Sequence, residues 1–228
     1  FEMYQLKHNA LPECGLDDIS FKSHLLGCDF DFPLFISSMT GGHGEATNLN
    51  ADIATFCEQF NIPFGVGSQR AMLEDSTHEK SFTIFRDKAP NAFIAANIGG
   101  AQLIGGMPTY GLKTMISSIQ ANAIIVHLNP LQELIQPEGD VQFSGVLKGI
   151  EQLVKHSSVP IIVKETGAGI DSSVAKRLLN VGVKVIDIAG VGGTSWSRVE
   201  AARIPQKRSR EMVVNNLTLQ YEQEMQER

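Results

Sequence analysis

The chain has 228 residues and a formal net charge of −6, with 43% hydrophobic and 19% charged residues. This length and balance fit one large soluble domain with a substantial core. The negative charge disfavours nucleic acid as a partner, because no basic surplus exists to neutralise phosphates. No apolar run reaches bilayer-spanning length and no signal peptide is visible, so neither a membrane partner nor secretion is expected.

The three cysteines, Cys14, Cys28 and Cys57, are odd in number and show no Cys-x-x-Cys spacing. We therefore expect reduced thiols in a cytoplasmic protein, with neither a disulfide framework nor a zinc site. No Gly-x-Gly-x-x-Gly fingerprint or Walker loop is present, which disfavours an ATP- or NAD-binding domain. The chain opens on Phe1 rather than Met, so its natural beginning is expected to be missing.

Short apolar runs alternate with amphipathic segments after a lead-in over residues 1–31. The runs with the character of buried strands are 32–36, 62–66, 92–96, 123–126, 159–163 and 183–189. Helical spacing is found at 46–60, 81–88, 144–156 and 172–181. In the first of these helices Leu49, Ile53 and Phe56 share one face. Residues 204–228 hold no strand-like run and predict a polar helical tail.

Alternation of this kind predicts right-handed βαβ units and a parallel sheet. Each predicted strand ends in a polar or glycine-rich loop, which favours a TIM (β/α)₈ barrel over an open Rossmann sheet. Two of the units that close an eight-stranded barrel are absent from the sequence. A fragment, lost segments or an unusual six-unit fold would each explain this, and we favour loss. The prediction is one incomplete barrel domain over residues 1–228.

The most informative stretch follows the strand at 123–126. There the chain offers an imidazole at His127, amides at Asn129 and Gln132 and a carboxylate at Glu133. Asn129 and Glu133 are oxygen ligands of the kind that Mg²⁺ prefers, and Gln132 could exchange protons or hydrogen bonds with a substrate. The structural alternative is a capped loop, with Asn129 as helix N-cap, Glu133 in the first turn and His127 in the core.

Polar side chains follow the other predicted strands as well, at Ser38, Thr40, Ser68, Arg70, Asn97, Lys164 and Thr194. Hydroxyls beside glycines let a flat ring approach the backbone, and a guanidinium suits a diphosphate. An amide can read a ring edge, an ammonium can neutralise its electron-rich end, and a hydroxyl in the last glycine-rich loop can cradle phosphate. Caps, turns and surface ion pairs are the alternatives. Six such loops are expected to meet at one end of the barrel, and this convergence favours a ligand-binding site over those structural roles.

Several segments resemble the type 2 isopentenyl-diphosphate isomerases. The matching segments are 8–13, 37–42, 65–70, 97–100, 127–133, 163–167 and 189–196. Segment 37–42, Ser-Ser-Met-Thr-Gly-Gly, is the loop that follows the first predicted strand. The resemblance extends from about residue 1 to residue 203. That family is an FMN-dependent TIM barrel that interconverts isopentenyl and dimethylallyl diphosphate with Mg²⁺ and a reduced flavin.

The resemblance implies flavin contacts at Ser38, Met39, Thr40, Ser68, Asn97, Lys164 and Thr194. It implies substrate contacts at Ser68, Gln69, Arg70, His127 and Gln132. It also implies catalytic roles for Gln132 and His127, and a metal site at Glu133 and Asn129. FMN, Mg²⁺ and NADPH as reductant are the implied cofactors, and the implied protein is a cytoplasmic homo-oligomer acting on an isoprenoid diphosphate.

The sequence also departs from the family. The basic Arg-Lys segment near the N-terminus and the seventh and eighth strands are missing, and Val141 stands where the family usually has arginine. Two other functions remain open. An α-hydroxy-acid oxidase would use similar flavin contacts, but would need a His–Asp base pair and paired arginines. A truncated barrel without catalytic activity is the third possibility.

Overall fold

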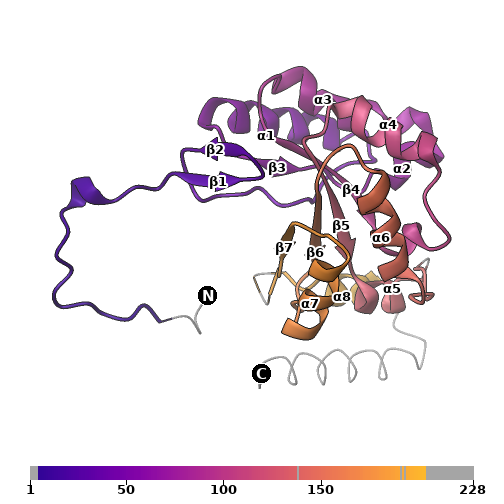
Figure 1. The fold of residues 1–228 in the computed structure, drawn as a ribbon. Coiled ribbons are helices and arrows are strands. Elements are labelled where there is room, and N and C mark those ends of the chain that lie inside the picture. The colour runs from indigo at the N-terminus through magenta and orange to yellow at the C-terminus, as the bar shows by residue number, and fades with distance from the viewer. Residues whose placement is uncertain (1–4, 138, 191, 193, 204–228) are drawn as a thin grey trace.

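The computed structural model describes residues 5–137, 139–190, 192 and 194–203. Five parallel strands form one sheet whose spatial order follows the chain (Figure 1). The strands are β3 (Phe64–Gly65), β4 (Ile94–Gly99), β5 (Ala123–Leu128), β6 (Ile161–Glu165) and β7 (Val185–Asp187). Parallel neighbours in chain order, connected through helices, form the wall of a barrel rather than a doubly wound sheet. The predicted α/β architecture is confirmed.

The helices lie mainly between successive strands, on the outer face of the sheet (Figure 1). They are α1 (Ala46–Phe60), α2 (Arg70–Glu74), α3 (Lys80–Lys88), α4 (Thr109–Ile119), α5 (Pro130–Ile135), α6 (Val146–His156), α7 (Ser172–Asn180) and α8 (Trp196–Arg203). Short 3₁₀ turns cover Leu16–Asp18, Ser76–His78 and Ala101–Leu103. No helix within the described residues is long and apolar enough to span a bilayer. The predicted polar tail lies outside the described residues.

The first predicted strand, 32–36, is reduced to a bridge between Ile36 and Phe64. The Ile36 N–H donates to the Pro63 carbonyl at 3.0 Å, and the Gly65 N–H donates back to the Ile36 carbonyl at 2.9 Å. Pro33 has no N–H to add to a ladder, which shortens the pairing. The sheet thus has a sixth position beside β3, as the six apolar runs predict.

The strands separate two apolar layers because successive side chains point to opposite faces. In β5, Ile124 and Val126 pack with the helices in the main core. Ala123 and Ile125 belong to a second cluster on the inner face, where the other buried members are Phe30, Phe93, Ala95 and Ile162. This alternation fixes which side chains can reach the inside of the curved sheet.

A hairpin that the sequence pattern did not predict packs against the inner layer. It consists of β1 (Ser23–Leu25) and β2 (Cys28–Phe30). Its turn at 26–27 has φ values of 50° and 86°, the left-handed conformation of a type I′ turn. The Phe30 ring meets the Phe93 ring edge-on, with centroids 5.9 Å apart. The hairpin therefore shields the inner cluster at the end of the sheet where the strands begin.

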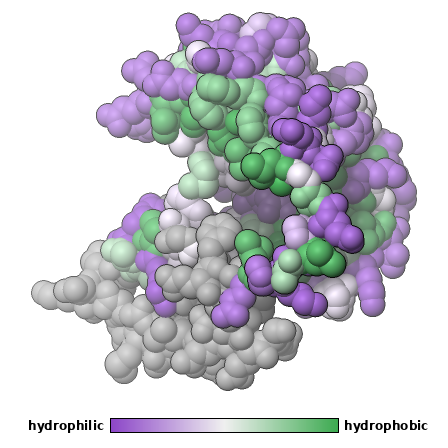
Figure 2. Space-filling model, turned by 90° about the vertical axis from the view of Figure 1, so that its left-hand side faces the viewer, coloured by the Kyte–Doolittle hydropathy of each residue, from purple (hydrophilic) through white to green (hydrophobic). Residues whose placement is uncertain are grey.

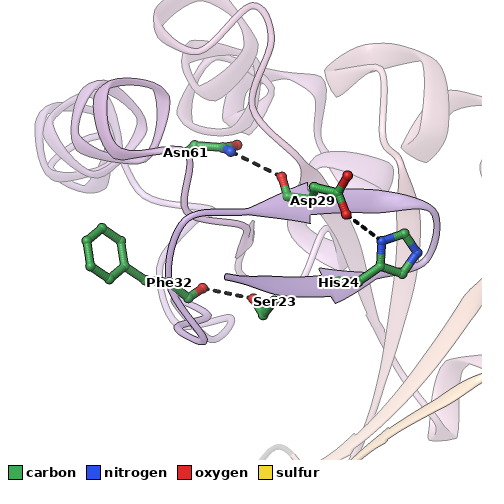
Figure 3. Close-up of polar contacts among 5 residues, drawn as sticks. All are labelled: Ser23, His24, Asp29, Phe32 and Asn61. Carbon is green, nitrogen blue, oxygen red and sulfur yellow. Dashed lines mark hydrogen bonds and ion pairs between the residues drawn. The ribbon is translucent and has the colours of Figure 1, made fainter. Parts of the chain in front are cut away.

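Polar contacts hold the hairpin in place (Figure 3). The Ser23 hydroxyl donates to the Phe32 carbonyl at 3.0 Å, and His24 Nδ1 lies 2.7 Å from Asp29 Oδ1. The Asn61 amide donates to the Asp29 carbonyl at 3.1 Å, which ties the hairpin to the C-cap residue of α1. Part of the expected lead-in is therefore ordered structure.

The sequence pattern placed α1 correctly, but of the three apolar residues on its one face only Ile53 packs against the core. Leu49 and Phe56 are 50% and 45% exposed. The fully buried positions are Asn50, Ala54 and Cys57, on a helix that packs chiefly against α3. Small side chains allow this close approach of two helices.

Figure 2 shows one face of the molecule with a hollow, and hydrophobic surface in green along part of its rim.

Arg86, in the last turns of α3, joins the segments that lead into β4 and β5. Its guanidinium lies within 3.4 Å of six oxygen acceptors, the carbonyls of Ala89, Pro90, Ala92, Ile119 and Gln120 and the Asn122 amide oxygen. A planar fork with five N–H donors can satisfy such a ring of carbonyls, whereas an ammonium cannot.

We predict that Arg86→Lys lowers the free energy of unfolding by about 1–3 kcal/mol, because several carbonyls, three of them partly buried, lose their donor. Urea-induced unfolding measures the change. The matched control is Arg177→Lys on the exposed face of α7, for which we expect a change within about 0.5 kcal/mol. Equal effects of the two substitutions would contradict the role assigned to Arg86.

Candidate functional site

Three polar side chains extend the inner layer toward the carboxyl ends of neighbouring strands. Asn97, His127 and Lys164 each come two residues after a member of the inner cluster, namely Ala95, Ile125 and Ile162. The register places His127 opposite Lys164, and Lys164 opposite Asp187 on β7. A period of two keeps each polar residue on the inner face. The strand ends therefore bring these side chains together.

A cleft of about 160 Å³ opens at this end of the sheet. We call it the strand-end cleft; its lining residues are Ser38, Met39, Gly67, Ser68, Asn97, His127, Gln132, Lys164, Thr166 and Trp196. It thus gathers most of the predicted flavin residues together with both predicted catalytic residues. Ligands bind at this end of parallel sheets in general.

The cleft contains a hydroxyl that has no hydrogen-bond partner in the described part of the chain. Ser38 Oγ is buried and makes no hydrogen bond among the described residues. It packs against β3 so closely that a Cβ at Gly65 would lie 2.3 Å away. A buried polar atom without a partner calls for an explanation, and a ligand in the cleft supplies one. By contrast, the Thr40 hydroxyl donates to Asn50 on α1, and Thr40 does not line the cleft.

His127 is a neutral imidazole in this environment. Its Nδ1 lies 2.7 Å from Asn97 Oδ1. A carbonyl oxygen only accepts, so Nδ1 carries the proton and Nε2 keeps its lone pair. Burial, followed by the charges of Lys164 and Arg70, lowers the pKa of His127 from 6.5 to about 4. Near neutral pH the group therefore offers one donor and one acceptor and no charge.

Lys164 is the charged group beside that imidazole. Only 7% of the residue is exposed, and its Nζ donates to the Glu165 carbonyl at 2.7 Å. Burial lowers the pKa of Lys164, while the carboxylates of Asp187 and Glu165 act in the opposite direction. A poorly hydrated ammonium interacts strongly with an anion that enters the cleft.

The candidate metal ligands lie together at the start of α5. The Asn129 amide donates to Gln132 Oε1 at 3.2 Å and to Glu133 Oε1 at 3.1 Å. Glu133 Oε2 accepts the Asp140 N–H at 2.7 Å. Asn129 occupies the N-cap position, but its side chain makes no cap hydrogen bond, unlike the alternative drawn from the sequence.

Oxygen donors of this kind suit Mg²⁺, which usually takes one or two carboxylates and completes its shell with water and substrate phosphates. No group of three or more His, Cys, Asp or Glu side chains suited to a metal occurs in the described part of the chain. The oxygens of Glu133 and Asn129 are donors of the kind that such an ion takes, and their role as metal ligands stays a prediction.

Several predicted residues do not reach the cleft. Gln69 is fully buried: its amide nitrogen donates to the Met115 carbonyl at 3.3 Å, and its oxygen accepts the Asn97 N–H at 3.2 Å. Arg70 lies 3.7 Å from a carboxylate on its own helix, and Thr194 is exposed. Their substrate and flavin roles stay predictions, and Gln69 acts here as a support for β4.

The structure adds a residue that the sequence reasoning missed. Glu200 on α8 is 6% exposed, and its Oε1 accepts from Gln132 Nε2 at 3.3 Å. Its other oxygen accepts from Arg203 Nη1 at 2.5 Å. Trp196, one helical turn earlier, lines the cleft. The i,i+4 spacing of Trp196 and Glu200 was the available signal.

Fold and site together define a protein of the parallel α/β barrel class with a polar cleft at the carboxyl ends of its strands. No protein-family model matches the chain. It is 49% identical over 202 residues to the isopentenyl-diphosphate delta-isomerase of Chlorobium phaeovibrioides, and 46% identical over 206 residues to that of Methanococcoides burtonii. These matches confirm the resemblance seen in the motifs: over most of its length the chain is similar in sequence to part of the isopentenyl-diphosphate delta-isomerases.

The matches cover 89% of this chain, but 57% and 56% of the two relatives. The chain thus spans little more than half the length of the relatives that it matches. Among solved structures, a flavocytochrome b2 mutant has a TM-score of 0.53 at 18% identity, covering 77% of this chain and 45% of its own. A mandelate oxidase mutant with a monooxide FMN adduct has a TM-score of 0.50 at 10% identity, with coverages of 75% and 51%. At these identities the likeness shows the fold alone.

We predict that the His127 imidazole titrates near pH 4, measured by NMR of the ring nitrogens. A folded pKa below the unfolded value of 6.5 means that its contribution to stability is complete above pH 6.5 and is lost as the pH falls toward 4. The loss amounts to about 3 kcal/mol. His127→Gln, which cannot titrate, should lack this part of the acid destabilisation. A pKa of 6.5 or higher in the folded protein would contradict the neutral assignment.

Proposed function

We propose that the complete protein interconverts isopentenyl and dimethylallyl diphosphate as a type 2 isomerase. The observation that carries the proposal is the convergence of the family-like residues Ser38, Ser68, Asn97, His127 and Lys164, with Gln132, on one cleft. The sequence similarity supports the same reaction. The α-hydroxy-acid oxidase alternative needs a His–Asp pair, whereas His127 is paired with the amide of Asn97.

The residues of the cleft fit a flavin such as FMN. Ser38 Oγ has no partner among the described residues, Asn97 would offer its amide, and the Lys164 ammonium would offset the negative charge of a reduced ring. When bound, a reduced flavin supplies an electron-rich surface that stabilises positive charge developing on the alkene. NADPH as reductant, a cytoplasmic location and a homo-oligomer complete the proposal, as the resemblance implies.

Moving a double bond requires one proton to be added and another removed. Gln132 lines the cleft, and its Nε2 donates to the buried Glu200 carboxylate, so Glu200 would orient the Gln132 amide toward a substrate with which it exchanges hydrogen bonds or protons. Because His127 is neutral, its Nε2 can accept a hydrogen bond from the substrate without adding a second positive charge beside Lys164. Glu133 and Asn129 would hold Mg²⁺, which neutralises the diphosphate.

The first prediction from the proposed function concerns Lys164→Ala. We expect FMN binding to weaken by tenfold or more, because the buried positive charge beside the ring is lost. Quenching of flavin fluorescence on titration measures the affinity. Lys148→Ala, on the exposed side of α6, should leave it within twofold. Unchanged flavin affinity in Lys164→Ala would remove the proposed contact.

The second prediction separates the proton relay from the metal site, because Gln132 and Glu133 are neighbours with different partners. Glu133→Gln removes a charge from the metal site and keeps its size, so excess Mg²⁺ should partly restore activity. Gln132→Leu removes the relay but not the metal ligand, so kcat should fall by about 10²-fold or more with unchanged Mg²⁺ dependence.

Exchange of substrate protons with deuterated solvent, followed by NMR, reports the chemical step directly. Each variant serves as the control for the other, because they adjoin in sequence and differ in role. If Gln132→Leu exchanges protons at the parent rate, or if added Mg²⁺ restores it, the relay assignment is wrong. Absence of isomerisation by the reduced, Mg²⁺-supplied parent protein would refute the proposed function itself.

A further inference from the structure

Glu165, the last residue of β6, is enclosed by its own loop. The residue is 8% exposed, and its Oε2 accepts three consecutive backbone N–H groups. The donors are Gly167 at 2.6 Å, Ala168 at 2.6 Å and Gly169 at 2.9 Å. Successive N–H groups that converge in this way form an anion-binding nest. Here the anion is a carboxylate of the chain itself.

The local sequence suits this arrangement. Gly167 has φ +139° and Gly169 has φ +94°, both in the region that favours glycine. The two glycines let the chain turn back on itself after the strand, so that the three N–H groups point to one oxygen. The curl of residues 166–169 therefore depends on the Glu165 carboxylate for its shape.

Glu165 also fixes the residue before it. Its backbone carbonyl accepts from Lys164 Nζ at 2.7 Å, and Lys164 lines the strand-end cleft. On the other side Thr166, which begins the curled loop, lines the same cleft. Glu165 is not among the cleft residues itself, but it holds the cleft residue on either side of it.

We propose that Glu165 is a positioning residue: its carboxylate holds the 166–169 loop, its carbonyl holds the Lys164 ammonium, and together they set the affinity of the strand-end cleft for a flavin. The inference rests on the proposed flavin-dependent function. It assigns no contact between Glu165 and the flavin, since the effect passes through Lys164 and Thr166.

A matched control lies at the opposite end of the sheet. The Glu58 carboxylate also accepts backbone N–H groups, from Asn91 at 3.0 Å and Ala92 at 2.8 Å, just before β4 begins. Its loss removes the same kind of interaction at a distance from the cleft. Glu58→Ala thus reports what a purely structural role would do.

The experiment measures three quantities for the complete protein and its variants. They are FMN affinity by fluorescence quenching, thermal unfolding, and hydrogen exchange of the 167–169 amides. We expect Glu165→Ala to speed the exchange of these amides and to weaken FMN binding tenfold or more. Glu165→Gln keeps an acceptor oxygen in place and should recover affinity to within about threefold of the parent. Glu58→Ala should lower the unfolding temperature with FMN affinity within twofold.

A second variant covers the case in which Glu165→Ala does not fold. Ala168→Pro deletes one N–H of the nest and keeps the carboxylate, so it should weaken FMN binding about threefold. Parent-like FMN affinity in a folded Glu165→Ala, or in Ala168→Pro when the first is unfolded, overturns the positioning role. So does a loss of affinity in Glu58→Ala equal to that in Glu165→Ala. A parent that binds no FMN instead overturns the proposed function.

Discussion

The register of β4, β5 and β6 is the constraint on which the site depends. Its pairs place Gly99 beside His127 and His127 beside Lys164. Because side chains alternate between faces, a slip of one residue would send His127 and Lys164 into the helix-packed core and bring apolar groups to the cleft. The buried apolar residues on both faces of these strands oppose such a slip. The same register pairs of β4, β5 and β6 therefore determine both the packing of the core and the positions of the polar side chains in the cleft.

The two ends of the sheet use polar groups differently. Where the strands begin, Arg86 and Glu58 form hydrogen bonds with the backbone of the loops that lead into β4 and β5. Where strands end, Ser38 Oγ has no partner among the described residues, and His127 Nε2 keeps a lone pair. Polar groups with spare bonding capacity are costly when buried, so they are expected where a ligand completes them. This asymmetry agrees with the division of barrels into a stabilising end and a functional end.

The sequence predicted the strands well because four of them are buried on both faces and read as continuous apolar runs. It placed the ends of β4, β5 and β6 two or three residues early, since β4 continues through Asn97 and β5 through His127, where polarity suggested a loop. It placed the ends of β3 and β7 one and two residues late. The hairpin escaped prediction because its strands have three residues each and gain stability from distant partners such as Phe93. The burial of Asn50 on α1 was not predicted, because it depends on tertiary hydrogen bonds that the periodicity of the sequence does not report. Glu200 was missed because it adjoins a tail that seemed featureless.

Two basic groups share the buried end of the sheet, and only one of them carries charge. His127 and Lys164 face each other across β5 and β6. The Lys164 charge and burial both depress the pKa of His127, whereas Asp187 and Glu165 oppose the effect of burial on Lys164. Among the residues that line the cleft, the positive charge thus lies on the β6 side, while the β5 side is polar and neutral. This division suits a ligand that has one anionic ring edge and an uncharged reacting carbon frame. If His127 and Lys164 were both charged, the site would not suit such a ligand.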